Sequence, residues 1–303
     1  MANKCRKHHS HATFYIMGKM QQQTTDKIEQ FRGHQIQHGK LSDRVYLMKM
    51  SSGSDTDLPN ELVHFAQVHQ YTKIFAKVPA NQTQLFLQSD YQIEASIPNF
   101  FGQDQDVHFL SYYLSADRKQ SKSDMFNQQV KSDCDSVSTD EPESLNSSLS
   151  LRLCSPDDIH QMAKLYGQVF PTYPFPIHDP DYIRETMLSH VVYFGIWQKH
   201  QLLALASSEI DFTSHTVEMT DFATHPDARG QRLAQHLLLA MQNEMKRRNI
   251  NLAYTIARAA SYGINLTFAR CGYTFAGRLI NNTQIAGKIE DMNVWYMSLE
   301  QLA

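Results

Sequence analysis

The chain has 303 residues, of which 42% are apolar and 11% aromatic, and its formal net charge is −3 at pH 7. This length suits two domains, and the composition suits globular folding around ordinary hydrophobic cores. A small negative charge excludes the general basic field with which proteins hold nucleic acid or an anionic membrane surface. We therefore expect neither a nucleic-acid partner nor a membrane partner.

The first residues and the cysteines favour a cytoplasmic location. The opening segment, MANKCRKHHSHATF, is basic but lacks the apolar core of a signal peptide, and no later apolar run approaches the roughly 20 residues of a membrane span. The cysteines are scattered, without a C-x-x-C pair, so neither a disulfide framework nor a zinc site is expected. His8, His9 and His11 could bind a metal ion, but residues 1–30 are interpreted as a polar tail.

Residues 31–114 are expected to form a smaller N-terminal α/β domain. Strands are predicted at Val45–Met48 and Ile74–Val78, and a helix is predicted near Leu62–Tyr71. Serine and acidic residues then dominate residues 115–150, which leave little to bury. This segment is predicted to be a low-complexity linker, mobile or in a long surface loop, and the domain boundary is placed there.

A faint internal repeat relates Lys73–Phe100 to Tyr254–Asn281. Both segments read as a strand, a short helix, an Asp-Tyr or Gly-Tyr pair and a further strand. The N-terminal domain is therefore interpreted as a degenerate half of the same fold as the C-terminal domain. It lacks a phosphate-binding turn, so no cofactor is assigned to it.

The C-terminal domain, residues 151–303, is predicted to open with a strand at Leu151–Leu153 and a capped helix at Asp158–Phe170. The proline-rich segment Pro171–Ile183 is predicted to be a stiff loop rather than a helix. Crossover helices between strands indicate a mixed α/β sheet. The further elements expected are strands at Val191–Trp197, Leu202–Ile210, Val217–Thr224, Leu252–Ala257, Tyr273–Ile280 and Asn293–Leu299, and helices from Leu233 and over Asn265–Arg270.

One stretch of the sequence indicates both a local fold and the type of ligand that it binds. The strand Val217–Thr224 is stopped by His225-Pro226, and an amphipathic helix starts at Leu233. Between them lies Arg229–Ala234, RGQRLA, where the first backbone N–H groups of the helix have no intrahelical acceptor. Such a helix start is a ready site for a pyrophosphate.

The segment Arg229–Ala234 resembles the acetyl-CoA signature of the GNAT acetyltransferases, [Q/R]-x-x-G-x-[G/A], with Arg232 in the place of the glycine. Arginine there could add charge to the phosphate site if its φ stays negative. The resemblance implies acetyl-CoA as co-substrate, without a metal, and a mainly antiparallel mixed sheet flanked by helices. It implies cofactor contacts from Phe222, Ala223, Thr224, Arg229, Gly230, Gln231, Arg232, Leu233, Ala234, Asn265 and Phe268.

Several phrases resemble one family within this group, the beta-lysine N6-acetyltransferases: QHGKLSDRVYLMKM, YTKIFAKVP, IEASIPNFF, YPFPIHDPDYI, ARAASYGINLTFARCGY and INNTQIAGKIEDMNVWY. The resemblance implies acetyl transfer to the side-chain amine of β-lysine, which a lysine 2,3-aminomutase supplies, to give the compatible solute N6-acetyl-β-lysine. Another small amine or a peptide amine stays open as the acceptor. A noncatalytic acyl-CoA sensor also stays open, because Phe268 and Arg232 stand where active relatives often differ. The sequence assigns no oligomeric state.

The chemistry requires a base, since an alkyl ammonium with a pKa near 10.4 must lose a proton before it attacks a thioester. Glu218 and Asp221, on the strand before the phosphate turn, are the candidates. In a regular strand they point to opposite faces, although the bulge usual in GNAT sheets would change this parity. Glu218 is favoured. Either carboxylate could instead pair with an arginine or bind the substrate ammonium.

The acid and the acceptor contacts are less defined. Many GNAT enzymes keep a tyrosine that protonates the leaving thiolate, but Phe268 stands at its position here, so Tyr262 and Tyr296 are the substitutes, with Tyr296 as the catalytic candidate. The thiol could also leave without help. A zwitterionic acceptor needs a cation and a carboxylate together. The candidates are Tyr173, Phe175, His178 and Asp179 in the stiff loop and Arg44 or Lys77 in the N-terminal domain.

Overall fold

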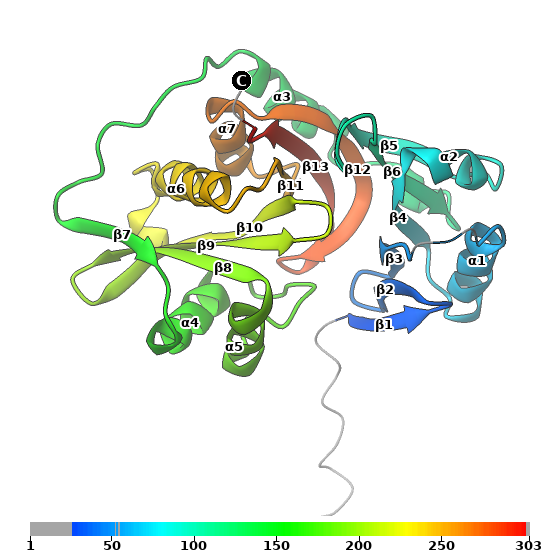
Figure 1. The fold of residues 1–303 in the computed structure, drawn as a ribbon, viewed down its shortest axis with the longest axis horizontal. Coiled ribbons are helices and arrows are strands. Elements are labelled where there is room, and N and C mark those ends of the chain that lie inside the picture. Colours follow the sequence, from blue (N-terminus) through cyan, green and yellow to red (C-terminus); the bar gives the residue numbers. More distant parts are fainter. Residues whose placement is uncertain (1–25, 52, 54, 301–303) are drawn as a thin grey trace, which may run out of the picture.

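A computed structural model describes residues 26–51, 53 and 55–300, so the candidate ligands His8, His9 and His11 lie outside the described residues. The described strands form one 13-stranded sheet in the order β1-β2-β3-β4-β6-β5-β12-β13-β11-β10-β9-β8-β7. It curves around its middle strands, β12 (Thr274–Ile285) and β13 (Lys288–Ser298), as Figure 1 shows. Among the described strands, only β3 with β4 and β10 with β11 pair in parallel. The predicted mixed, mainly antiparallel α/β fold is confirmed.

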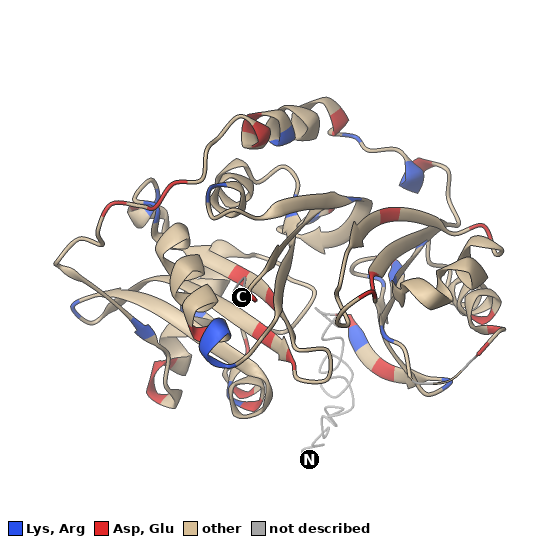
Figure 2. Ribbon diagram, turned by 45° about the horizontal axis from the view of Figure 1, so that its top comes forward, with Lys and Arg blue, Asp and Glu red and all other residues tan. Residues whose placement is uncertain are grey.

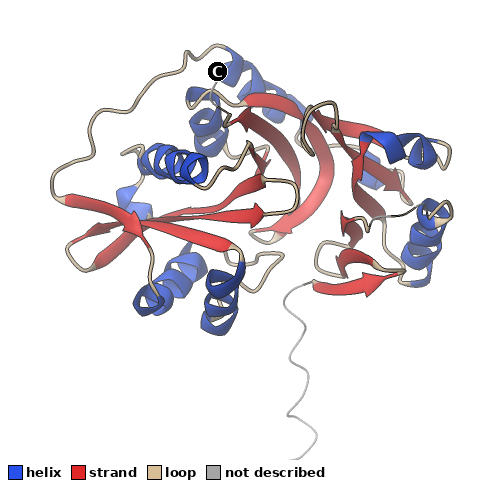
Figure 3. Cartoon of the chain, viewed as in Figure 1, coloured by secondary structure: helices blue, strands red, loops and turns tan. Residues whose placement is uncertain are grey.

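The C-terminal half, residues 149–300, places helices on both faces of its strands. Helices α6 and α7 pack on one face and α4 and α5 on the other (Figure 3). The strands predicted at Val191–Trp197 and Leu202–Ile210 are present and form a hairpin, since Gln198 pairs with Gln201. Its remaining elements are β7 (Leu149–Leu153), α4 (Ile159–Val169), α5 (Pro180–Ser189), β8 (Val191–Gln198), β9 (Gln201–Asp211), β10 (Thr216–Thr224), α6 (Leu233–Arg247), β11 (Leu252–Arg258) and α7 (Tyr262–Arg270).

The stiff loop is shorter than the sequence indicated. Pro180 begins α5, and the side chain of Asp179 caps this helix by accepting a hydrogen bond from the Asp181 N–H at 2.9 Å. Proline is tolerated in the first turn of a helix because its missing N–H has no intrahelical partner there. The prediction of a loop through Ile183 is therefore wrong beyond Asp179.

The N-terminal half, residues 26–113, repeats the arrangement of β8 to β13. Helix α1 connects the parallel pair β3 and β4, as α6 connects β10 and β11, and β5 lies outside β6 as β12 lies outside β13. The predicted repeat is therefore present over the whole half. Its elements are β1 (Lys27–Phe31), β2 (His34–Gly39), β3 (Arg44–Lys49), α1 (Leu58–Val68), β4 (Lys73–Pro79), α2 (Ala80–Leu87), β5 (Gln92–Ile97) and β6 (Val107–Tyr113).

The two halves join where β5 meets β12. Gly277 pairs with Ala95, and a Cβ on Gly277 would lie 2.1 Å from the Glu94 carbonyl oxygen, so only glycine fits. Beside this contact the buried Lys73 ammonium lies 3.1 Å from the Glu94 carboxylate and donates to the Ile280 carbonyl at 2.6 Å. A desolvated ion pair of this kind is costly to break, because either partner alone would be an unpaired buried charge.

The segment expected to be a linker packs against both halves. It contains α3 (Asp124–Asp135), which contacts α7 and buries Asn127, Val130 and Cys134. Arg118 is 9% exposed and donates to the Ser42 and Asn281 carbonyls at 2.6 and 2.8 Å. The prediction of a mobile linker is therefore wrong for residues 115–136, because buried polar contacts tie this segment down where apolar residues are few.

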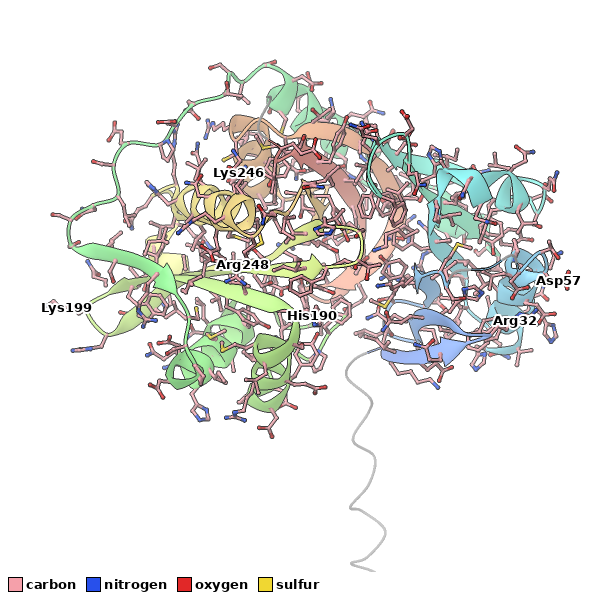
Figure 4. All side chains as sticks on the ribbon, viewed as in Figure 1. Arg32, Asp57, His190, Lys199, Lys246 and Arg248 are labelled. Carbon is pink, nitrogen blue, oxygen red and sulfur yellow. The ribbon has the colours of Figure 1, made fainter. Side chains whose placement is uncertain are left out.

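Charge is spread over the molecule. Acidic and basic residues are intermixed on both halves, without a face of one sign in this view (Figure 2). The labelled side chains in Figure 4 place Lys199, in the β8–β9 turn, and Asp57, before α1, at opposite ends of the molecule. No helix among the described residues is long and apolar enough to cross a membrane.

Candidate functional site

The sheet opens between β10 and β11. Their parallel pairing ends at Glu218 and Tyr254, although β10 continues to Thr224 and β11 to Arg258. On the other side of β10, the register with β9 shifts between Thr220 and Ala223, and Asp221 has a φ of 56°. The expected bulge is present, the two strands splay apart beyond their pairing, and the bulge turns Glu218 and Asp221 toward one cavity.

Three neighbouring cavities follow this opening. The helix cavity, of 560 Å³, lies at the start of α6, and the splay cavity, of 70 Å³, lies between β10 and β11. The inter-half cavity, of 110 Å³, is lined by side chains of both halves. The first two share Phe170, Phe222, Arg258, Ser261 and Ile264, and the last two share Tyr173, Thr220, Asp221, Ile256, Ile285 and Met292.

The phosphate turn has two residues in the left-handed region, Gly230 with φ 82° and Arg232 with φ 53°. The condition of a negative φ at Arg232 is therefore not met. Its guanidinium lies 2.9 Å from the Asp140 carboxylate, so this charge already has a partner. The residues of the motif that line the helix cavity are Arg229, Gly230, Arg232, Leu233 and Ala234.

The other residues expected to touch the cofactor differ in whether their side chains reach the helix cavity. Phe222 and Thr224 line the helix cavity, whereas Gln231 is exposed outside it. The Ala223 side chain is 1% exposed and packs in a core, so only its backbone could act there. Leu233 is also buried, at 2% exposed, and its contribution would come from the N–H of the first helical turn.

Phe268 does not reach any of the three cavities. It is 0% exposed and its ring packs edge-on against Phe222 at 5.6 Å and Tyr273 at 4.9 Å between centroids. The prediction that Phe268 contacts the cofactor is therefore wrong. A tyrosine hydroxyl at this position would be buried in the same apolar contacts and would need a partner of its own.

Asn265 is also an internal residue, and its assignment to cofactor binding is wrong. Its Nδ2 donates to the Arg258 and Ser261 carbonyls at 2.9 and 2.8 Å. Its Oδ1 accepts from Asn293 Nδ2 at 2.9 Å and from Trp295 Nε1 at 3.0 Å. The side chain thus fixes the loop before α7 to strand β13.

Asn265→Ala is expected to lower the free energy of unfolding by about 2–4 kcal/mol, because two buried donors lose their acceptor. Urea denaturation measures this loss. Asn243→Ala, on the exposed face of α6, is the matched control and should change stability by less than about 0.5 kcal/mol. A loss at Asn265 no larger than at Asn243 would contradict the assigned role.

Three carboxylates line the inter-half cavity, and two of them, Glu218 and Glu209, lie on neighbouring strands. Glu218 pairs across the sheet with Glu209, so both side chains leave the same face. Burial, followed by the Glu209 carboxylate, raises the pKa of Glu218 to about 8, and the Lys77 ammonium opposes this shift. Glu218 is therefore poised to exchange a proton near neutral pH.

Asp221 is held by hydrogen bonds from two hydroxyl groups. It accepts hydrogen bonds from the Tyr173 hydroxyl at 2.5 Å and from the Ser207 hydroxyl at 2.6 Å. Burial raises the pKa of Asp221, and these two hydrogen bonds oppose the shift. A carboxylate held by two hydroxyls suits positioning, which supports the preference for Glu218 as the base.

The acceptor candidates are only partly brought together. Arg44, Lys77, Tyr173 and Phe175 line the inter-half cavity. His178 and Asp179 are exposed outside it, so their assignment is wrong. Tyr296, the expected acid, is partly buried against a core and lines none of the three cavities, and Tyr262 is 47% exposed.

Sequence reasoning missed Glu209, Ser207, Tyr254 and Asn282, which all line the inter-half cavity. For Glu209 a signal existed, because a hairpin register between two strands pairs it with Glu218. The other positions depend on contacts between distant segments. Within the described residues, no group of His, Cys, Asp and Glu side chains could hold a metal ion.

Comparisons with known proteins identify the family of the chain. The family model described as "Acetyltransferase (GNAT) family" matches residues 159–273. Beta-lysine N(6)-acetyltransferase of Methanococcus maripaludis is 36% identical over 272 residues, 89% of this chain and 98% of that protein. N-acetyltransferase YodP of Bacillus subtilis is 30% identical over 268 residues, 87% of this chain and 95% of that protein. A spermidine N-acetyltransferase structure from Vibrio cholerae covers 51% of this chain and 95% of its own, with 18% identity and a TM-score of 0.44.

Proposed function

Because this chain belongs to the GNAT family of N-acetyltransferases, and within it to the beta-lysine N6-acetyltransferases, we propose that it transfers the acetyl group of acetyl-CoA to the N6 amine of β-lysine. The continuous run from the helix cavity through the splay to a carboxylate-lined cavity carries this proposal. A donor and an acceptor entering from opposite ends would meet at the splay.

Acetyl-CoA binding rests on the helix cavity. The pyrophosphate would accept hydrogen bonds from the first-turn N–H groups of α6, including those of Leu233 and Ala234. Arg229 lines the same cavity and adds a cation. The acetyl thioester would lie in the splay cavity beside Phe222, where the backbone of β10 has left β11.

The chemical steps follow from the groups around the splay. Glu218 takes the proton of the N6 ammonium, and the neutral amine attacks the thioester carbonyl carbon. Backbone N–H groups around Phe222 to Thr224 stabilise the oxyanion that forms. The intermediate then collapses: the carbon–sulfur bond breaks, the CoA thiolate leaves, and the attacking nitrogen releases its remaining extra proton to give the neutral amide.

Tyr173 takes the place expected for Tyr296 as the acid. It lines both the splay cavity and the inter-half cavity, so its hydroxyl lies between the two substrates. Burial and the Asp221 carboxylate raise the pKa of Tyr173 well above its usual value, which keeps the hydroxyl protonated. Tyr173 would donate its hydroxyl proton to the leaving thiolate and take up the proton that the attacking nitrogen releases, so that CoA leaves as the thiol and Tyr173 is restored.

The shape of the acceptor site favours a small amine over a peptide. Strands β3 and β4 and the segment around Tyr173 to Ile177 enclose the inter-half cavity. Gln37 on β2 donates to the Pro174 carbonyl at 3.1 Å, which ties this cover to the N-terminal half. β-Lysine, which a lysine 2,3-aminomutase makes, is a small amine that suits such a cavity. Its acetylated product carries less charge, which suits a role as compatible solute.

The experiment measures CoA release with β-lysine, α-lysine, spermidine and a lysine-containing peptide as acceptors. The proposal predicts the highest kcat/KM for β-lysine and little turnover with the peptide. Acetyl-CoA binding without turnover of any acceptor would instead identify an acyl-CoA sensor. Preferred turnover of the peptide would assign a protein acetyltransferase.

A further inference from the structure

A buried arginine in the N-terminal half has no carboxylate partner among the described residues. Arg44, the first residue of β3, is 4% exposed and lines the inter-half cavity. Its Nη1 donates to the Asn282 carbonyl at 2.7 Å and to Thr283 Oγ1 at 2.8 Å, and its Nη2 donates to Gln37 Oε1 at 3.4 Å. These partners are all neutral.

Two other buried cations nearby are paired, whereas Lys77, which lines the same cavity, has no ion-pair partner within 4 Å among the described residues. Lys73 lies 3.1 Å from Glu94, and Arg118 lies 3.3 Å from Asp43. Burial lowers the pKa of Arg44 to about 10, so its guanidinium is still charged at neutral pH. A buried charge without a counter-ion is costly, and an anionic ligand would offset this cost.

One donor of Arg44 is buried without a partner. Its Nε has no hydrogen-bond partner among the described residues. The guanidinium also lies over the rings of Tyr46 and Phe75, at 5.3 and 5.5 Å from their centroids, which fixes its plane. An arginine held in one plane with a free Nε–H is arranged to bind a carboxylate.

A free acceptor lies next to this free donor. Asn282 is 1% exposed and lines the same cavity, and its Oδ1 has no partner among the described residues. Its backbone carbonyl is the group that holds Arg44 Nη1, so the two residues are adjacent. The Arg44 donor can bind an anion and the Asn282 acceptor can bind a cation. Together they suit a ligand that carries a carboxylate next to an ammonium.

We propose that Arg44 and Asn282 form a head-group subsite that binds the carboxylate and the C3 ammonium of the acceptor. The inference rests on the proposed function, and it makes the junction of the two halves the part of the enzyme that selects amino acids over simple diamines. Glu209 and Glu218 line the cavity from the C-terminal half and attract the second ammonium. Binding the head group at Arg44 therefore directs N6, and not the C3 amine, to the base.

The wild-type enzyme tests the subsite without any substitution. 1,4-Diaminopentane is β-lysine with its carboxylate replaced by hydrogen, so it keeps both amines. We expect kcat/KM for β-lysine to exceed that for 1,4-diaminopentane by about 10²-fold, since a buried arginine would otherwise stay unpaired. Equal values in an enzyme that acetylates β-lysine would overturn the subsite and leave the proposed function intact.

Arg44→Met should remove this discrimination by lowering kcat/KM for β-lysine by about 10²-fold, mainly through KM, with a change of less than about threefold for 1,4-diaminopentane. Lys49→Met is the matched control, because Lys49 is on the same strand but outside the cavity, paired with Asp211. It should change neither acceptor. An equal loss on both acceptors in Arg44→Met would show a purely structural role and contradict the proposal.

Two further variants complete the test. Arg44→Lys keeps the charge without the planar fork, so it should recover part of the preference for β-lysine even if Arg44→Met folds poorly. Asn282→Leu should lower kcat/KM about tenfold for β-lysine and leave 6-aminohexanoate, which lacks the C3 amine, unchanged. Loss of both acceptors to the same extent in Asn282→Leu would exclude Asn282 from the subsite. Absence of β-lysine turnover in the wild type would refute the proposed function itself.

Discussion

Glu218→Gln is expected to lower kcat by about 10²–10⁴-fold while the affinity for acetyl-CoA stays nearly unchanged, because the variant cannot take the proton of the acceptor ammonium. Glutamine keeps the size and hydrogen-bonding shape of the side chain. Single-turnover rates and calorimetric titration with acetyl-CoA measure the two quantities. Wild-type turnover in Glu218→Gln would exclude this residue as the base.

The pH dependence of the rate distinguishes titration of the base from titration of the substrate amine. With the pKa of Glu218 at about 8, the wild-type rate should rise through this pH as the carboxylate forms. A required neutral amine also makes the rate rise with pH, but toward the amine pKa near 10.4. The variant should therefore lose the limb near pH 8 and keep only the rise at higher pH.

Stability provides a control for folding of this variant. The folded pKa of Glu218 lies above its usual value of 4.5, so the folded state binds the proton more tightly than the unfolded state. Stability from this group is therefore present at low pH and is lost as pH rises from 4.5 through about 8. Glu218→Gln should accordingly melt at or above the wild-type temperature at pH 9.

Asp221→Asn serves as the matched comparison on the same strand. Asp221 already accepts from Tyr173 and Ser207, so its loss should disorient these hydroxyls, raise KM for the acceptor and lower kcat less than Glu218→Gln does. If Asp221→Asn instead lost turnover while Glu218→Gln kept it, the two roles would be exchanged. Activity in both variants would show that water alone removes the proton.

Gly230→Pro is expected to raise the Kd for acetyl-CoA by about 10²-fold, equivalent to losing roughly two charge-assisted hydrogen bonds of about 1.5 kcal/mol each. Proline fixes φ near −65°, whereas Gly230 has a φ of 82°, so the turn before α6 must change its path. Isothermal titration calorimetry measures the affinity, and circular dichroism verifies that the variant is folded.

Two glycine variants accompany this test. Gly230→Ala places a Cβ in open space at a positive φ and should weaken binding less than proline does. Gly167→Ala, in the exposed part of α4 with open space around it, should leave the affinity unchanged. Unchanged affinity in a folded Gly230→Pro would remove the helix start from the cofactor site.

The sequence predicted those parts of the site that depend on local pattern. Alternating and helical spacing places β10, the turn and α6 within a residue or two of their bounds, and the repeat of β4 to β5 in β11 to β12 is visible from residue types alone. That Glu218 and Asp221 face the same cavity was predictable only by assuming a bulge, because in a regular strand their side chains point to opposite faces. Local chemistry was enough to identify these groups.

The remaining errors concern contacts between distant segments. Arg232 was expected to face phosphate, but Asp140, which lies far away in the sequence, pairs with it. Asn265 and Phe268 lie on the last helix as expected, yet the helix turns them toward β13 and the core. Spacing within one element does not show which of its faces a distant strand covers. The packing of Arg118 and α3 was missed for a similar reason, because few apolar residues in this segment indicate it.

The acetylated position of β-lysine is the most direct test of the account. The wild-type enzyme is incubated with ¹³C-acetyl-CoA and β-lysine, and the product is analysed by heteronuclear NMR. Head-group binding at Arg44 and proton removal by Glu218 predict that the label is found only on N6. Label on the C3 nitrogen, or a mixture of both products, would contradict the proposed arrangement of the two halves around the substrate.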